Sequence, residues 1–311
     1  MCTSWTGSLA QGLTGSRLSP LSAFPRACYG EIVIKTILVG LDGSEHSRTA
    51  ARYALWLAER LHGCVVGLHV VDIVSIEGSF FHDISGSLGF EPYLDFSSKM
   101  RGVLEERGRA LLDAFSEQAA QRNVRADTVM AMGIVANEIS ERARTADLVV
   151  IGHRGVNERF STGLLGSTSE SVTRKCPKPV FISPMTFTEV RSPLLAYDGS
   201  TRAAAVMQQA AEFCTALRLP LTVLTVNRDE EQGRRVLAEA EAYLGPYGLT
   251  TRVELQQTGN APERIANFIR ERGHDLLFIG AYGHGRIIEM VLGSTTEYVL
   301  RNADCPVFLH R

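Results

Sequence analysis

Small residues follow an apolar run near the C-terminus in a pattern that suits an anion. The run 276–279 ends at Gly280, Gly283 follows, and nine residues later Gly293 and Ser294 open a segment with helical spacing. Glycine lets backbone N–H groups come close to a ligand. The first N–H groups of a helix lack partners within the helix, and the positive end of its dipole attracts anions. The pattern therefore favours a phosphate site.

A carboxylate follows a second apolar run in the same half of the chain. Asp198-Gly199-Ser200 comes after residues 193–197. In open parallel sheets, ligands bind beyond the carboxyl ends of the strands, where the strand order reverses. A carboxylate on one side and a helix start on the other favour a nucleotide, with Asp198 near the adenine or ribose. Taken singly, Asp-Gly-Ser is a common capping turn and Gly-Ser a common N-cap.

The chain repeats these features at a long interval. Residues 36–72 parallel 192–227, residues 146–155 parallel 274–283, and residues 164–183 parallel 291–310. A repeat of this length indicates two copies of one domain rather than a solenoid. We expect domains at 32–184 and 192–311, joined through the proline-bracketed stretch 183–193.

Apolar runs and helical spacing alternate along each copy. The first copy predicts strands at 36–41, 64–71, 125–132, 147–151 and 179–183, and helices after 44 and at 99–122, 136–145 and 167–175. The second predicts strands at 193–198, 221–226, 250–257, 275–279 and 306–310, and helices at 200–218, 229–245, 261–272 and 294–302.

This alternation predicts an α/β fold of two tandem doubly wound, Rossmann-like domains. Each domain is expected to hold a five-stranded parallel sheet with helices on both faces. The last strands, 179–183 and 306–310, are apolar and would be exposed edges, which proteins avoid. We predict that they pair antiparallel and join the copies as an internal pseudo-dimer.

With these motifs in view, the chain from about residue 32 resembles the universal stress protein family. The resemblance lies in Gly280-x-x-Gly283, nine residues and Gly293-Ser294, and in the strand that ends at Asp198-Gly-Ser. It implies binding of ATP or AMP, with or without Mg²⁺, and pairing of domains through the last strand. The residues implied for the nucleotide are Ala196, Asp198, Val226, Gly280, Gly283, Gly293, Ser294 and Thr295.

The first copy departs from this pattern. Ten residues, not nine, separate Gly155 from Gly166, and the spacer carries Glu158 near the expected phosphates. We therefore expect the second copy to bind nucleotide more tightly than the first. The matching residues of the first copy are Asp42, Val70, Gly152, Gly155, Gly166, Ser167 and Thr168.

The composition argues against several classes of function. The 311 residues carry a net charge of −2, so the composition gives no sign of a basic surface for nucleic acid. No apolar run approaches the ~20 residues that a membrane helix needs. Six scattered cysteines without metal-ligand spacing favour free thiols in a reducing cytoplasm and no metal site.

No catalytic arrangement is evident in the sequence. His153 and His284 flank the glycines, but a loop histidine is more often a solvated surface group, and His69 is expected to bond to the backbone. We expect a regulatory or stress-protective nucleotide-binding protein with little or no turnover. Two alternatives are a slow ATP hydrolase or adenylyl-transfer enzyme, and a protein interaction module that binds no nucleotide. Protein partners, a homodimer among them, stay unspecified.

Two segments fall outside the repeat. Residues 1–31 hold no Asp or Glu, and we expect a disordered or non-native tail. From Asp42 to Gly133 is 91 residues, but from Asp198 to Gly259 it is 61, and most of the difference is the segment 72–99. We expect this aromatic-containing segment to be a lid, a partner-binding surface, or a connection packed on the neighbouring domain.

Overall fold

The structure is a computed structural model that describes residues 34–72, 90–155, 167–280 and 293–310. The tail at 1–31 lies outside these residues, and so does most of the segment 72–99, including any lid that it forms. The first half runs through β1 (Thr36–Gly40), α1 (Glu45–Leu61), β2 (Cys64–Asp72), α4 (Phe90–Gln121), β3 (Arg125–Gly133), α5 (Val135–Arg142), the 3-10 helix η2 (Ala143–Thr145), β4 (Leu148–Gly152), α6 (Ser167–Lys175) and β5 (Val180–Ser183).

The second half repeats this order. It runs through β6 (Pro193–Ala196), α7 (Thr201–Leu217), β7 (Leu221–Val226), α8 (Glu230–Leu244), the 3-10 helix η4 (Gly245–Tyr247), β8 (Thr251–Gln256), α9 (Ala261–Arg272), β9 (Leu276–Gly280), α10 (Ser294–Asn302) and β10 (Val307–His310). Most of these bounds lie within two residues of those expected from the sequence.

One helix is longer than the sequence predicted. We expected it from residue 99, but α4 begins at Phe90. Pro92 lies in its first turn, where a backbone N–H has no partner within the helix, so a proline is tolerated there. The part of the segment 72–99 that begins at Phe90 is therefore helical rather than irregular.

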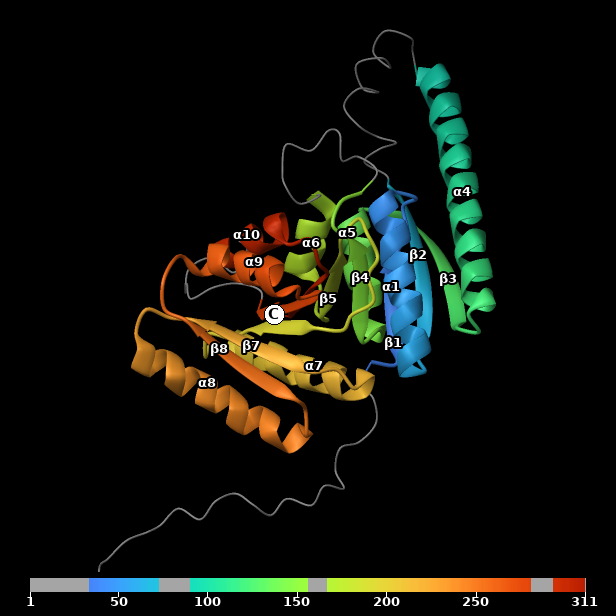
Figure 1. The fold of residues 1–311 in the computed structure, drawn as a ribbon. Coiled ribbons are helices and arrows are strands. Elements are labelled where there is room, and N and C mark those ends of the chain that lie inside the picture. Colours follow the sequence, from blue (N-terminus) through green and yellow to red (C-terminus); the bar gives the residue numbers. More distant parts are fainter. Residues whose placement is uncertain (1–33, 73–89, 156–166, 281–292, 311) are drawn as a thin grey trace, which may run out of the picture. The chain divides into compact units, whose positions relative to one another are not determined.

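The strands form one sheet with the order β3-β2-β1-β4-β5-β10-β9-β6-β7-β8 (Figure 1). Within each half all five strands are parallel, and the order reverses between β1 and β4 and between β6 and β9. The predicted antiparallel pairing of the last strands is confirmed, because Phe308 of β10 lies opposite Phe181 of β5. The α/β, doubly wound fold class is confirmed as well.

Two apolar layers hold the helices on the sheet. Helices α1, α4, α7 and α8 cover one face and helices α5, α6, α9 and α10 cover the other (Figure 1). The layers result from the alternation of side chains along each strand, since Leu38 points to one face while Ile37 and Val39 point to the other.

Both halves begin and end their first helix in the same way. Ser44 accepts a hydrogen bond from the Ser47 N–H at 3.1 Å, and Ser200 accepts one from the Ala203 N–H at 3.2 Å. These N-caps place the Asp-Gly-Ser turns at the carboxyl ends of β1 and β6. Each helix then ends at a residue in the left-handed conformation, as at Arg218 with φ of 56°.

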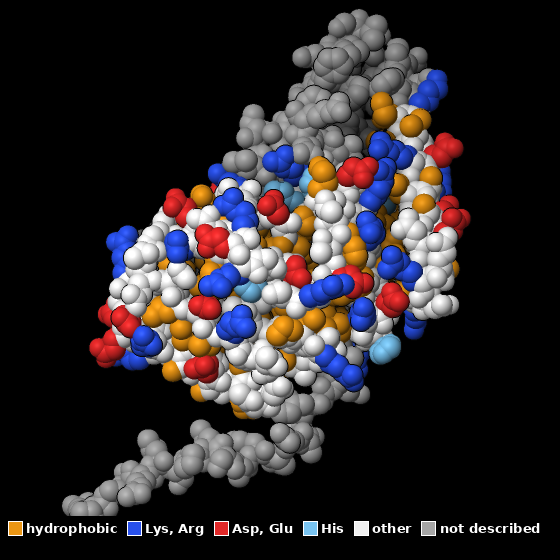
Figure 2. Space-filling view, viewed as in Figure 1, with side chains coloured by type: hydrophobic (Ala, Val, Ile, Leu, Met, Phe, Trp, Pro, Cys, Tyr) orange, Lys and Arg blue, Asp and Glu red, His pale blue; other side chains and the backbone are white. Residues whose placement is uncertain are grey.

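Charged side chains of both signs are interspersed on the visible face of the molecule (Figure 2). Several pair within one helix, as Glu230 does with Arg234 at 2.6 Å. Such exposed pairs contribute little to stability, typically below about 1 kcal/mol each.

The stretch between the halves is fastened to α1. The Tyr53 hydroxyl donates to the Thr188 carbonyl oxygen and accepts from the Thr188 N–H, both at 3.0 Å. The centre of the Phe187 ring lies 4.6 Å from that of the Tyr53 ring. The Arg52 guanidinium lies over the Phe187 ring, 4.6 Å from its centre. Burial raises the pKa of Tyr53 to about 12, so its hydroxyl keeps its proton. The junction is therefore a docked segment, not a free linker.

Replacing Tyr53 with Phe should lower the free energy of unfolding by about 1–3 kcal/mol, because two backbone groups of Thr188 lose a buried partner. Urea denaturation measures this. Tyr243→Phe, at a tyrosine that is 37% exposed, is the matched control and should change little. Equal effects of the two substitutions would contradict the role given to Tyr53.

Candidate functional site

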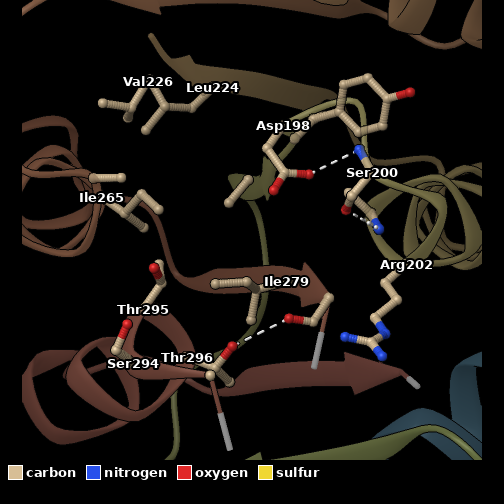
Figure 3. A pocket seen from close by; sticks show the side chains of 16 residues that line it. Asp198, Ser200, Arg202, Leu224, Val226, Ile265, Ile279, Ser294, Thr295 and Thr296 are labelled. Carbon is tan, nitrogen blue, oxygen red and sulfur yellow. Dashed lines mark hydrogen bonds between the residues drawn. The ribbon is translucent and has the colours of Figure 1, made fainter. Parts of the chain in front are cut away.

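A cavity opens at the carboxyl ends of β6, β7 and β9, where the strand order of the second half reverses (Figure 3). The first turns of α7, α9 and α10 close its sides. Its lining residues are Ala196, Tyr197, Asp198, Ser200, Arg202, Ala203, Leu224, Val226, Ala261, Ile265, Ile279, Gly280, Gly293, Ser294, Thr295 and Thr296.

The structure brings together the residues that the sequence singled out in the second copy. Seven of the eight line this one cavity, namely Ala196, Asp198, Val226, Gly280, Gly293, Ser294 and Thr295. The eighth, Gly283, lies outside the described residues, as does the loop 281–292.

Asp198 is held in place by the turn that it begins. One carboxylate oxygen, Oδ1, accepts a hydrogen bond from the Ser200 N–H at 2.9 Å. Gly199 makes the turn possible, since its φ of +77° is a conformation that favours glycine. Asp198 is exposed, so its carboxylate stands at the mouth of the cavity with its orientation set by the backbone.

Gly280 brings three elements together at the base of the cavity. A Cβ on this residue would lie 3.2 Å from the Ala203 nitrogen in the first turn of α7. On its other side, the Thr296 hydroxyl of α10 donates to the Gly280 carbonyl oxygen at 3.1 Å. A side chain at Gly280 would therefore push α7 away from β9.

The start of α10 is suited to an anion. Its N-cap residue, Gly293, has no side chain that could accept from the N–H groups of the first turn. Ser294 and Thr295 add hydroxyl groups beside those N–H groups, and both line the cavity. This arrangement can hold a phosphate through backbone donors and the helix dipole.

The opposite wall is apolar. Leu224, Val226 and Ile265 lie together on one side of the cavity (Figure 3). Such a wall can pack against a flat aromatic ring, while nearby polar groups fix its orientation.

Tyr197 also lines the cavity, and its hydroxyl donates to Glu239 at 2.7 Å. Burial, followed by this hydrogen bond, raises the pKa of Tyr197, so it stays protonated.

Sequence reasoning missed several lining residues. Ile265 and Ala261 come from α9, whose apolar spacing indicates only a helix that packs on the sheet. Arg202 carried a usable signal, since it follows Asp198 by four residues in the first turn of a predicted helix. The full set that was missed is Tyr197, Ser200, Arg202, Ala203, Leu224, Ala261, Ile265, Ile279 and Thr296.

The first half assembles part of a similar site. The Ser44 N–H donates to Asp42 Oδ1 at 2.8 Å, and a Cβ on Gly155 would lie 2.9 Å from Asp42 Oδ2. Asp42 therefore lies against the glycine that follows β4. Ser169 donates to the Gly152 carbonyl oxygen at 2.8 Å, which matches the bond from Thr296 to Gly280.

The remaining residues of the first copy are placed only in part. Val70 lies near the end of β2, and Thr168 lies in the first turn of α6. Ser167 is the first residue of that helix, while Gly166 and Glu158 lie outside the described residues.

The histidines near the strand ends differ in their surroundings. His69 Nδ1 lies 2.7 Å from the Leu41 carbonyl oxygen, which confirms the expected backbone partner. His153 is half-buried, with its ring 6.3 Å from that of His46, so the expectation of a solvated surface group was wrong. The tertiary structure places His153 against His46 of α1, and the sequence alone does not indicate this contact. His284 lies outside the described residues.

Comparison with known proteins decides the family. The model of the universal stress protein family matches residues 34–184 and again residues 191–311. The chain belongs to the universal stress protein family. A universal stress protein of Synechocystis is 30% identical over 288 residues, which cover 89% of this chain and 100% of that relative. One from Mycobacterium tuberculosis is 26% identical over 300 residues, covering 91% and 98%.

A solved structure supports the same fold. The crystal structure of a universal stress protein from Archaeoglobus fulgidus superposes with a TM-score of 0.69 at 23% identity. It covers 89% of this chain and 96% of that protein, so the likeness extends over both halves. The doubly wound sheet is therefore the fold of this universal stress protein throughout the compared length.

Within the described ranges, none of the helices is long and apolar enough to cross a membrane. The same residues contain no group of three or more His, Cys, Asp or Glu side chains that could hold a metal ion. Cys64, Cys176, Cys214 and Cys305 are free thiols.

Proposed function

We propose that the second half of this universal stress protein binds ATP or AMP and acts as a regulatory or stress-protective protein with little or no turnover. The observation that carries the proposal is one cavity that combines an apolar wall, the Asp198 carboxylate and the open N-terminus of α10. An adenine, a ribose and a phosphate need an apolar surface, a hydrogen-bond acceptor and an anion site, and this cavity offers all three.

The residues that we propose for the nucleotide divide by chemistry. Val226 and Ala196 would pack against the adenosine, and Asp198 would accept hydrogen bonds from it. Gly280, Gly293, Ser294 and Thr295 would hold the ribose and phosphates, with or without Mg²⁺. We further propose 32–184 and 192–311 as the two domains, with weaker binding in the first.

The lining supports binding over hydrolysis. Turnover requires a group that positions or deprotonates a water near the terminal phosphate. Asp198 is the sole carboxylate among the described residues of the lining, and its turn already engages one oxygen. A slow ATPase is the second candidate, and phosphate release measured with purified protein and Mg²⁺-ATP distinguishes it from a binder.

The direct test of the proposal is mass spectrometry of the protein purified without added nucleotide, combined with calorimetric titration of ATP, AMP and GTP. We expect co-purified adenine nucleotide, or saturable ATP binding that GTP does not reproduce. Absence of both would show that the cavity serves another purpose, such as contact with a protein.

Asp198→Ala should weaken ATP binding by about 1.5–3 kcal/mol, the usual loss of a hydrogen bond to a charged group. Because Asp198 also holds the turn before α7, Asp229→Ala is the matched control. Asp229 caps α8 by accepting from the Gln232 N–H at 3.0 Å and does not line the cavity. Calorimetry should show weaker binding in the first variant alone, and equal loss in both would contradict a direct role for Asp198.

A further inference from the structure

Arg202 is a cationic residue in a cavity whose other described lining residues are neutral, apart from the carboxylate of Asp198. It lies in the first turn of α7 and is half-buried. Among the described residues that line the cavity, it is the one Lys, Arg or His side chain. A half-buried guanidinium attracts anions more strongly than an exposed one, because water screens its charge less.

Arg202 lies next to Gly280, at the junction of α7 and β9. A Cβ built on Gly280 would lie 3.3 Å from the Arg202 Cβ and 3.2 Å from its carbonyl carbon. Gly280 is in turn bonded to α10 through Thr296. The start of α10 and Arg202 therefore flank the same glycine from two sides.

Arg202 lies on the side of the cavity opposite the apolar wall. Figure 3 shows it on the side of the cavity opposite Val226 and Ile265, with Ile279 between them. A ligand with its ring on the apolar wall and one phosphate on α10 would leave the Arg202 side of the cavity unfilled. A longer chain of phosphates that extended from α10 past Gly280 would approach Arg202, which flanks the same glycine.

We propose that Arg202 makes this cavity selective for nucleotides with a polyphosphate chain over nucleoside monophosphates. The inference rests on the proposed nucleotide binding. It adds that the charge of Arg202 recognises the phosphate end of the ligand. Guanidinium presents a planar fork of N–H donors that matches phosphate oxygens and stays charged at every physiological pH. It also offsets the negative charge of Asp198, which would otherwise repel added phosphates.

The two halves differ at this position. The repeat places His46 of α1 where α7 carries Arg202. His46 is buried, and a Cβ on Gly152 would lie 2.7 Å from its Cβ. A buried imidazole packed on β4 cannot supply the permanent charge that Arg202 supplies. Selectivity for polyphosphate is therefore a property of the second half.

The test is calorimetric titration of the full chain with ATP, AMP and adenosine, in the wild type and in Arg202→Gln. We expect ATP affinity to fall roughly 10- to 100-fold, the usual effect of losing a charge-assisted hydrogen bond, while adenosine affinity changes less than about twofold. Arg235→Gln is the matched control, because that side chain is 70% exposed on α8 and lies outside the lining. It should leave all three affinities unchanged.

Arg202→His, measured at pH 8, is the second variant. Histidine is the residue that the chain itself accepts at the matching position of α1, and at pH 8 it is largely uncharged. It should reproduce the selective loss of ATP affinity with an unchanged melting temperature. Equal losses for ATP and adenosine, or no loss for ATP in either variant, would overturn the inference while nucleotide binding stands. A wild type that binds none of the three ligands overturns the proposed function and the inference with it.

Discussion

Gly293→Val is expected to abolish measurable ATP binding, a loss of more than about 100-fold. Gly293 is the N-cap of α10 and lines the cavity, so its missing side chain leaves the first N–H groups of the helix accessible. A branched side chain there would occupy the space that a phosphate needs. Its backbone, at φ of −57° and ψ of 140°, is open to valine, so the fold should persist. Calorimetric titration with ATP measures the loss.

Gly102→Val is the control for this substitution. Gly102 lies in α4, and a Cβ there would have no atom within 4 Å. This variant should bind ATP as the wild type does, and its helix should persist because valine is a better helix former than glycine. An unchanged ATP affinity in a folded Gly293→Val protein would count decisively against the assignment of the phosphate site.

Phe308→Ala is expected to lower the free energy of unfolding by about 3–5 kcal/mol. Phe308 is fully buried in β10, with its ring 5.0 Å from Phe278 and 6.2 Å from Phe213. Removing the ring loses buried apolar area and leaves a cavity between the sheet and α7, since neighbours relax only in part. The site also faces Phe181 across the pairing of β5 with β10. Urea denaturation of the full chain measures the change.

Val103→Ala provides the comparison for that experiment. Val103 is 61% exposed on α4, so its truncation should change the free energy of unfolding by less than about 0.5 kcal/mol. A loss below about 1 kcal/mol for Phe308→Ala would show that β10 contributes little to the folded state. Such a result would also contradict the view that the pairing of β5 with β10 stabilises the ten-stranded sheet.

The sequence by itself determined the elements, the repeat and the pairing of the last strands. Apolar runs such as 276–279 are buried on both faces of a sheet, so their composition alone marks them as central strands. The apolar character of 179–183 and 306–310 likewise required a cover, and β5 and β10 cover each other. The family resemblance rested on glycines and Asp198, whose spacing is readable without any coordinates.

Only the tertiary structure decided which other side chains share the cavity. Ile265 and Arg202 belong to helices whose sequences indicate an amphipathic pattern but not the rotation of the helix about its axis. That rotation is set by packing on the sheet, as when Gly280 admits the first turn of α7 to within contact distance. The same packing buries His46 against Gly152 in the first half and leaves Arg202 beside the cavity in the second. Local sequence determines periodicity, whereas contacts between segments far apart in the chain determine where each side chain points.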